Sequence, residues 1–125
     1  PHLGPFSGPA GLNLQECLQI AGISWSELYR TNVIKDLDKP LSSYIEVRSG
    51  KNAKAIVTAM GERYIRDLAD ELAAIRPNVI VAAGNVALWS ICSRIGITSW
   101  RGSVLDSTLL PGRKVIPTIH PATWT

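Results

Sequence analysis

Two short apolar segments limit the possible folds of this chain more than any other feature of its sequence. Residues 78–82 read NVIVA and residues 114–119 read KVIPTI, with Pro77 and Gly84 as turn-forming neighbours of the first segment. Apolar runs of this length are typical of strands that are buried on both faces of a sheet. They predict two neighbouring strands in the core of the protein.

Helical patterns alternate with these strands. Residues 60–75 place Ile65, Leu68, Leu72 and Ile75 on one face, and Pro77 ends that pattern. Further helices are predicted over residues 9–22, with Gly22 as the stop, and over residues 85–95. Helices that alternate with buried strands favour a parallel sheet with right-handed crossovers, so the expected fold class is α/β.

The remaining segments are predicted from turn signals and local apolar content. Residues 31–35 (TNVIK) read as a further strand, preceded by a short turn of helix near Ser24 or Ser26. Residues 36–54 read as a long loop or a partly flexible insertion, and residues 97–109 as an irregular arm or edge strand. All 125 residues are expected to form one domain, 1–125. We expect it to be truncated at both ends, because the chain starts without Met and ends directly after a motif-like segment.

Composition narrows the class of protein. Hydrophobic residues make up 46% of the chain and charged residues 18%, which is typical of a globular domain. Apolar stretches are shorter than the roughly 20 residues that span a membrane, and no secretory signal is visible, so we expect a cytoplasmic protein without a membrane partner.

The net charge of +3 suits a polyanionic partner only weakly. Cys17 and Cys92 form no CxxC pattern and are expected to be buried and reduced.

In parallel sheets, ligands bind at the carboxyl ends of the strands, so His120 and Asn32 are candidate binding-site residues. His120 follows the second apolar strand and precedes Pro121, so it is positioned to donate a hydrogen bond to a developing anion. The alternative is an ordinary histidine in a surface loop. Asn32 offers one acceptor and two donors, the complement of the amide edge of a pyrimidine; a structural amide is the alternative.

The N-terminal segment GPFSGPAG places Phe6 in a loop before a helix N-terminus. Such an end presents free N–H groups to an anion, and Gly8 and Gly11 allow close approach of the backbone. Phe6 is therefore a candidate for stacking on a base, with a core-packing phenylalanine as the alternative.

Five ordered segments of the chain resemble a known family. PFSGPAG, TNVIK, IRPNVIVAAGNVA, WRG and IPTIHPAT occur in the order and spacing of the family 4 uracil-DNA glycosylases, including proteins related to a bacteriophage DNA polymerase. The resemblance covers nearly the whole chain. It implies a three-layer α/β/α fold with a short, mostly parallel central sheet whose first strand is missing from this chain.

The resemblance also implies roles for individual residues. Phe6 matches the aromatic residue that stacks on the flipped uracil, and Asn32 matches the amide that reads its edge. His120 matches the catalytic histidine that hydrogen-bonds uracil O2 as the base leaves. Trp124 lies at the wedge position that enters the duplex, with core packing as the alternative. The other DNA-binding candidates are Gly8, Gly11, Lys35, Lys39 and Arg101, where solvated surface charge is the alternative for the three basic residues.

This chain departs from the family pattern in two places. Family 4 members hold an iron–sulfur cluster on four cysteines, but two of those positions are Asp36 and Tyr64 here, and Cys17 and Cys92 lie elsewhere. We therefore expect no cofactor, no metal and no cluster. The first family motif, whose acidic or polar group positions the attacking water, would stand before Pro1.

The expected function is that of a DNA-repair enzyme that hydrolyses the N-glycosidic bond of uracil in DNA by base flipping, acting as a monomer and leaving an abasic site. The missing first motif favours an alternative, a catalytically impaired module of a phage or replication protein that binds DNA or a partner. A third possibility is an enzyme for another deaminated base. The expected location is the cytoplasm of a bacterial or phage-infected cell.

Overall fold

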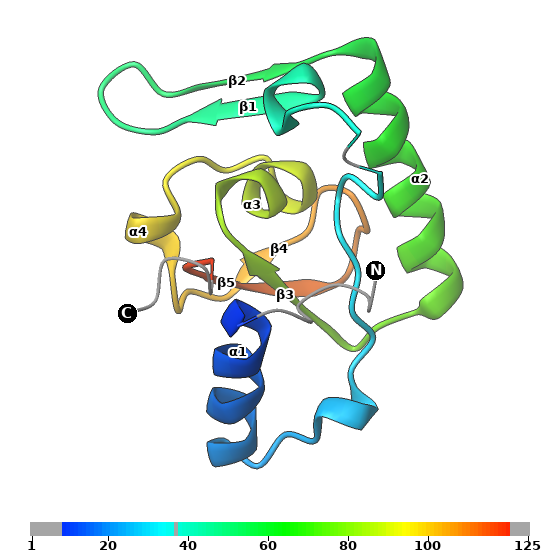
Figure 1. Ribbon diagram of the computed structural model, residues 1–125, viewed down its shortest axis with the longest axis vertical. Helices are drawn as coiled ribbons and strands as arrows, with labels where there is room; N and C mark the ends of the chain where they lie inside the picture. Colours follow the sequence, from blue (N-terminus) through cyan, green and yellow to red (C-terminus); the bar gives the residue numbers. More distant parts are fainter. Residues whose placement is uncertain (1–8, 37, 121–125) are drawn as a thin grey trace. The chain divides into compact units, whose positions relative to one another are not determined.

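The computed structural model describes residues 9–36 and 38–120 of the chain (Figure 1). These residues belong to two compact units. The first contains the described residues up to Asn32 together with His120, and the second is Val33–Ile119. The prediction of a single domain over residues 1–125 stays a prediction.

The first unit contains helix α1 (Pro9–Ile20) and the 3₁₀ helix η1 (Trp25–Glu27). Gly22 has φ = +82°, and the Ile23 N–H donates to the carbonyl of Leu18 at 2.8 Å. This left-handed glycine with a hydrogen bond across the last turn is a common helix stop. The predicted helix over residues 9–22 and the short turn of helix near Ser24 are therefore confirmed.

Residues 31–35 do not form the predicted strand. They adopt a bend, in which Val33 and Ile34 are both buried while Asn32 is exposed. A strand sends successive side chains to opposite faces and needs a neighbour for its backbone hydrogen bonds. TNVIK is apolar because two consecutive side chains, Val33 and Ile34, are buried. A buried strand would have the same composition, so the sequence alone could not distinguish the two structures.

The second unit contains a three-stranded sheet in the order β3-β5-β4. Strands β3 (Val79–Ala83) and β5 (Lys114–Thr118) are parallel, with Val81 opposite Ile116. The short edge strand β4 (Leu105–Asp106) runs antiparallel to β5. The α/β class and both apolar strands are confirmed, and the sheet is mixed.

Strands β3 and β5 are buried on only one face of the sheet. Ala82 and Val115 are fully buried, whereas Val79 is 52% exposed and Val81 is 55% exposed. Helix α3 (Asn85–Cys92) packs against β3 and β5. The expectation of burial on both faces was wrong, because a five-residue apolar run has the same composition whether one face or both faces are covered.

Helix α2 (Ala59–Ile75) confirms the predicted helix over residues 60–75, with Leu68 and Leu72 buried. Helix α3 ends earlier than predicted, at Cys92, and the following Ser93 has φ = +59°. The segment predicted as an arm contains the short helix α4 (Ile97–Trp100) as well as β4.

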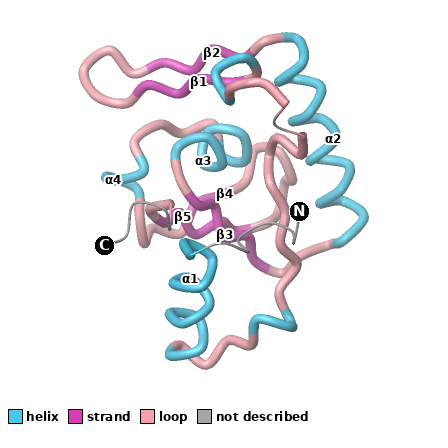
Figure 2. Tube along the Cα trace, in the orientation of Figure 1, coloured by secondary structure: helices cyan, strands magenta, loops and turns pink. Residues whose placement is uncertain are grey.

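Part of the predicted loop over residues 36–54 forms regular secondary structure (Figure 2). It contains the 3₁₀ helix η2 (Leu41–Ser43) and strand β1 (Ile45–Arg48), which pairs with β2 (Lys54–Val57) in an antiparallel hairpin. Alternating apolar residues on either side of Gly50 were the available signal for this hairpin. The loop prediction was therefore wrong for η2 and for the strands of the hairpin.

The start of α2 is fastened to the residue before the hairpin. The Thr58 hydroxyl accepts a hydrogen bond from the Gly61 N–H at 3.1 Å and lies 3.0 Å from the carbonyl oxygen of Ser43. The Thr58 N–H donates to the carbonyl of Tyr44 at 3.0 Å. Thr58 thus caps the helix and joins it to the chain beneath the hairpin.

Tyr44 is fully buried and its hydroxyl donates to the Asp38 carboxylate at 2.6 Å. This hydrogen bond, together with burial and the charge of Asp38, raises the pKa of Tyr44 to about 12. An unfolded tyrosine ionises near pH 10, so above that pH the unfolded chain loses a proton that the folded chain retains. We therefore expect the free energy of unfolding to fall as the pH rises from about 10 to about 12.

Denaturant titrations at several pH values measure this loss of stability. In Tyr44→Phe, which cannot ionise, the fall between pH 10 and 12 is expected to be clearly smaller. Tyr29→Phe, at a tyrosine that is 59% exposed, is the matched control and is expected to retain the wild-type profile. Parallel profiles for all three proteins would remove Tyr44 as the cause.

Candidate functional site

The carboxyl edge of β3 and β5 is closed by two backbone hydrogen bonds. The Gly84 N–H donates to the carbonyl of Thr118 at 2.9 Å, and the Gly102 N–H donates to the carbonyl of Pro117 at 3.0 Å. Gly84 has φ = +90°, a conformation that favours glycine and turns the chain from β3 into α3. Two loops distant in sequence therefore meet at the end of β5.

His120 follows Thr118, the last residue of β5, by two positions and is exposed. Asn32 is also exposed, and both residues belong to the first unit. The structure therefore brings into one compact unit two of the three residues expected around the base. Phe6, together with Gly8 and Trp124, lies outside the described residues.

Gly11 is part of a helix rather than of the preceding loop. Helix α1 begins at Pro9, so Gly11 lies in its first turn, where it is buried. Proline is favoured at the first helical position because it has no N–H to leave unpaired. The start of the helix at Pro9 agrees with the sequence prediction, and the DNA-binding role of Gly11 stays a prediction.

The predicted phosphate-binding residues differ in their surroundings. Lys35 forms an ion pair with Glu71 on α2 at 2.8 Å. Arg101 is exposed directly after α4 and next to Gly102, whose N–H bonds to β5. Lys39 is exposed as well. Among the three basic candidates, Arg101 lies beside the carboxyl end of β5, because the neighbouring Gly102 is hydrogen-bonded to that strand.

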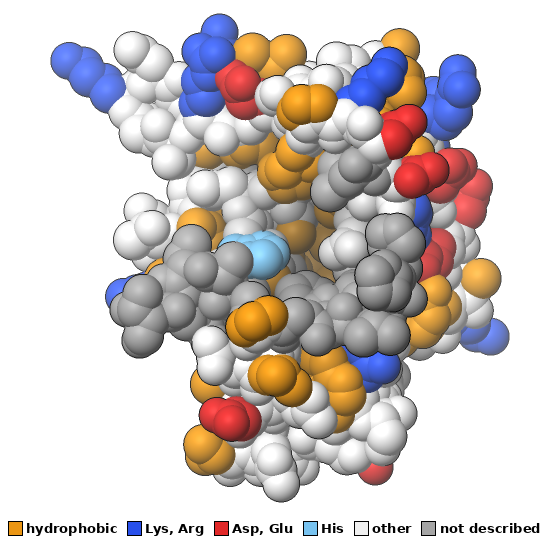
Figure 3. Space-filling model, viewed as in Figure 1, with side chains coloured by type: hydrophobic (Ala, Val, Ile, Leu, Met, Phe, Trp, Pro, Cys, Tyr) orange, Lys and Arg blue, Asp and Glu red, His pale blue; other side chains and the backbone are white. Residues whose placement is uncertain are grey.

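A further source of positive charge lies on the hairpin, where sequence reasoning expected only a loop. Arg48, Lys51 and Lys54 are exposed on β1, β2 and the turn between them, and Glu46 is the acidic residue among them. Figure 3 shows basic side chains along the edge of the molecule that carries this hairpin. Lysine and arginine side chains on such an arm are suited to contact phosphates.

The residues of this chain do not fit a four-cysteine cluster. Cys92 is buried in the second unit, whereas Cys17 is exposed on α1. Asp36 is exposed, and the ring of Tyr64 packs edge-to-face on Tyr44 with centroids 5.6 Å apart. Across residues 9–36 and 38–120, no three His, Cys, Asp or Glu side chains lie together as metal ligands would. The expectation of no cofactor stays a prediction.

The two thiols are expected to differ in reactivity. Burial raises the pKa of the Cys92 thiol, and thiolate is the reactive form, while Cys17 is exposed. The expectation that both cysteines are buried was wrong for Cys17. In the native protein without reducing agent, the Cys17 thiol is expected to react promptly with a disulfide reagent. The Cys92 thiol is expected to react only as the chain unfolds. Cys17→Ser should lose the fast phase; retention of that phase would contradict the assignment.

None of the helices in the described part of the chain has the length and apolar character needed to cross a membrane.

The fold is that of an α/β protein, and a histidine follows the last residue of its central strand by two positions along the chain. Its sequence matches the family described as the uracil DNA glycosylase superfamily over residues 4–124. It is also 33% identical over 120 residues to the type-4 uracil-DNA glycosylase of Thermotoga maritima. The chain belongs to the uracil-DNA glycosylase superfamily and is similar to its type-4 members. The alignment covers 94% of this chain and 55% of that relative, so the chain spans about half of the relative's length.

Proposed function

We propose that this protein hydrolyses the N-glycosidic bond between uracil and deoxyribose in DNA. The match to the superfamily over residues 4–124 carries this proposal, because it includes the positions of Phe6, Asn32, His120 and Trp124. The similarity to a type-4 uracil-DNA glycosylase supports the same base. The product would be an abasic site in DNA.

In the proposed reaction the target nucleotide leaves the base stack and enters a pocket. Extrusion costs a few kcal/mol, which contacts in the pocket offset. Phe6 stacks on the base and Asn32 hydrogen-bonds its amide edge. Trp124 fills the space that the nucleotide leaves in the duplex.

The bond between the sugar and N1 of uracil then breaks with its electron pair moving to the base. Uracil departs as an anion, and the sugar develops oxocarbenium character. His120 donates a hydrogen bond to O2 of the leaving base, where negative charge accumulates. Water attacks the anomeric carbon and releases a proton to the solvent, and the uracil anion takes up a proton from the solvent, which completes the hydrolysis. Asn32 and His120 belong to the same compact unit, which supports a shared role for them.

Basic side chains are proposed to hold the phosphates on either side of the extruded nucleotide. Arg101 is the first candidate because it is exposed beside the carboxyl end of β5. Lys35 would have to exchange its ion pair with Glu71 for a phosphate. The hairpin residues Lys51 and Lys54 extend the positive surface. We place this activity in a monomer in the bacterial cytoplasm, in keeping with the bacterial relative.

The test is incubation of the full-length protein with single-stranded and duplex DNA that contain one uracil, followed by alkaline cleavage of abasic sites. Matched strands with thymine or hypoxanthine at the same position test the choice of base. Strand cleavage only with uracil would support the proposal. DNA binding without base release would instead favour the catalytically impaired binding module.

A further inference from the structure

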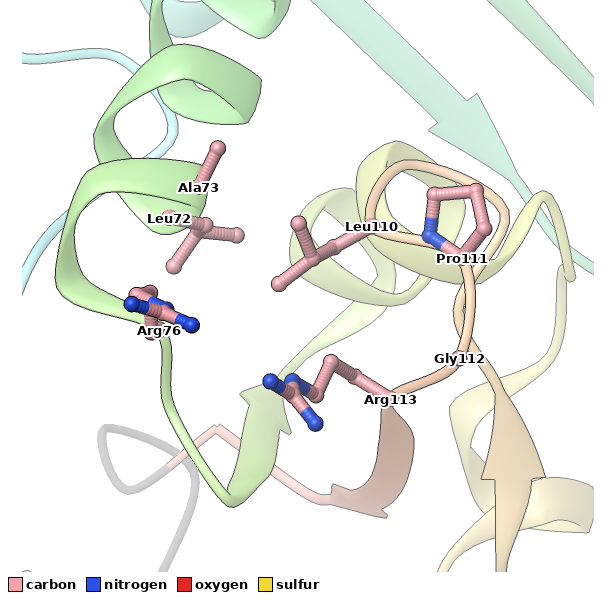
Figure 4. Close-up of a pocket in the computed structure, with 7 residues that line it drawn as sticks. All are labelled: Leu72, Ala73, Arg76, Leu110, Pro111, Gly112 and Arg113. Atoms are coloured by element: carbon pink, nitrogen blue, oxygen red, sulfur yellow. The ribbon is translucent and has the colours of Figure 1, made fainter.

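A cavity of about 290 Å³ lies in the second unit, between the end of α2 and the turn before β5 (Figure 4). In the close-up, Leu72 and Leu110 approach one another from opposite sides of the cavity. The side chains of Arg76 and Arg113 reach toward the same space below them. The cavity thus combines an aliphatic wall with two guanidinium groups from different elements.

Both arginines are attached to fixed points of the backbone. Arg76 ends α2 with φ = +58°, and its N–H donates to the carbonyl of Leu72 at 2.9 Å. The Arg113 carbonyl accepts a hydrogen bond from the Ser107 N–H at 2.9 Å. Little backbone order would therefore have to be gained on binding a ligand, which lowers the entropic cost of association.

The turn that carries Arg113 is held from inside the protein. The buried Ser107 hydroxyl donates to the carbonyl of Ile91 at 2.9 Å and accepts from the Leu110 N–H at 2.9 Å. The Arg113 N–H donates to the carbonyl of Leu110 at 3.3 Å. Leu110 and Arg113 thus belong to one hydrogen-bonded turn, which supplies both an aliphatic and a charged part of the cavity.

The positive charge of the cavity comes from two guanidinium groups. Considering residues 9–36 and 38–120, neither Arg76 nor Arg113 forms an ion pair with a carboxylate. The neighbouring Lys114 is paired with Asp106 at 2.5 Å. The dipole of α2 favours a cation at Arg76, but Arg113 comes from a separate turn and gains nothing from being the end of a helix. Two converging guanidinium groups instead suit an anionic ligand.

We propose that this cavity binds a peptide carboxylate flanked by an aliphatic side chain, presented by an acidic or C-terminal segment of a partner protein. The planar guanidinium matches a carboxylate with paired hydrogen bonds, and the leucine wall accepts the aliphatic side chain. A DNA backbone fits less well, because a sugar–phosphate chain has no apolar group to place against Leu72 and Leu110.

The position of the cavity separates it from the proposed reaction. Arg76 and Arg113 precede the amino ends of β3 and β5, whereas His120 follows the carboxyl end of β5 along the chain. Partner binding there would leave the substrate end of the strands open. The inference therefore stands independently of the proposed glycosylase activity.

Fluorescence anisotropy with a fluorescein-labelled peptide tests the proposal. The probe is Ser-Gly-Asp-Leu with a free C-terminus, titrated with the full-length protein in the absence of DNA. An amidated form lacks the terminal carboxylate and shows whether that group or the aspartate side chain is bound. A Ser-Gly-Asp-Gly form lacks the aliphatic side chain and measures its contribution. Arg76→Gln and Arg113→Gln remove the guanidinium groups, and Lys114→Gln removes one adjacent charge that does not line the cavity.

We expect each arginine variant to weaken peptide binding about tenfold or more, as loss of a charge-assisted hydrogen bond requires. Lys114→Gln is expected to stay within about twofold, and replacing leucine by glycine in the peptide should weaken binding about tenfold. Unchanged thermal unfolding of the variants verifies their fold. The proposal is overturned by no binding at about 1 mM protein, by equal weakening in Lys114→Gln, or by displacement of the peptide with uracil-free DNA.

Discussion

His120→Ala is expected to lower the rate of uracil release by about 100-fold to 1,000-fold, the usual effect of removing a donor aimed at developing negative charge. The proposed hydrogen bond strengthens as the base becomes an anion, so the loss should lie in the maximal rate. DNA affinity should change little, because the neutral base in the ground state gains much less from the same donor. Single-turnover kinetics with uracil-containing DNA measure the rate directly.

Two further variants sharpen this test. His120→Gln retains an amide donor and is expected to lose less activity than His120→Ala. His2→Ala removes the other histidine of the chain and controls for a general effect of histidine loss. Full activity in a folded His120→Ala protein would exclude this residue from the mechanism. An equal loss in both His120 variants would mean that donation of a hydrogen bond is not its role.

Gly61→Ala is expected to destabilise the protein by about 3 kcal/mol, at the upper end of the usual cost of overpacking a core. Gly61 is buried in the first turn of α2, and an added Cβ would fall on the carbonyl group of Tyr44, 2.8 Å from its carbon. That carbonyl already accepts the Thr58 N–H, so neither element can move without breaking the attachment of helix to hairpin. Urea titration measures the loss.

The sign of the effect makes this prediction informative. In an exposed helix, alanine is more stable than glycine by about 0.5–1 kcal/mol, so without the contact Gly61→Ala would stabilise the protein. Ala74→Gly, at an exposed position of the same helix, measures that ordinary preference. A stability gain in Gly61→Ala would show that α2 does not approach Tyr44 as closely as the structure has it.

The two variants report on different parts of the molecule. Gly61 concerns the attachment of α2 and the hairpin in the second unit, while His120 belongs to the first unit. Loss of activity in His120→Ala with unchanged stability, together with loss of stability in Gly61→Ala, would separate the proposed chemistry from the support of the fold.

The sequence by itself determined the α/β class, the two apolar strands, helices α1 and α2, and the family. These features follow from local periodicity and ordered motifs: Leu68 and Leu72 recur at helical spacing, and Gly22 and Pro77 mark helix ends. Such signals lie within a few residues of one another, so they can be read without knowing what each element packs against.

Only the tertiary structure decided which face of the sheet is buried, that TNVIK is no strand, and that Ile45–Arg48 forms a hairpin with Lys54–Val57. It also decided that Arg76 and Arg113 share a cavity. Each of these outcomes depends on residues distant in the chain, because burial and strand pairing are properties of a side chain's neighbours in space. Val81 and Ala82 are both apolar residues of one strand, yet the first is 55% exposed and the second fully buried, since only one face of the strand meets α3.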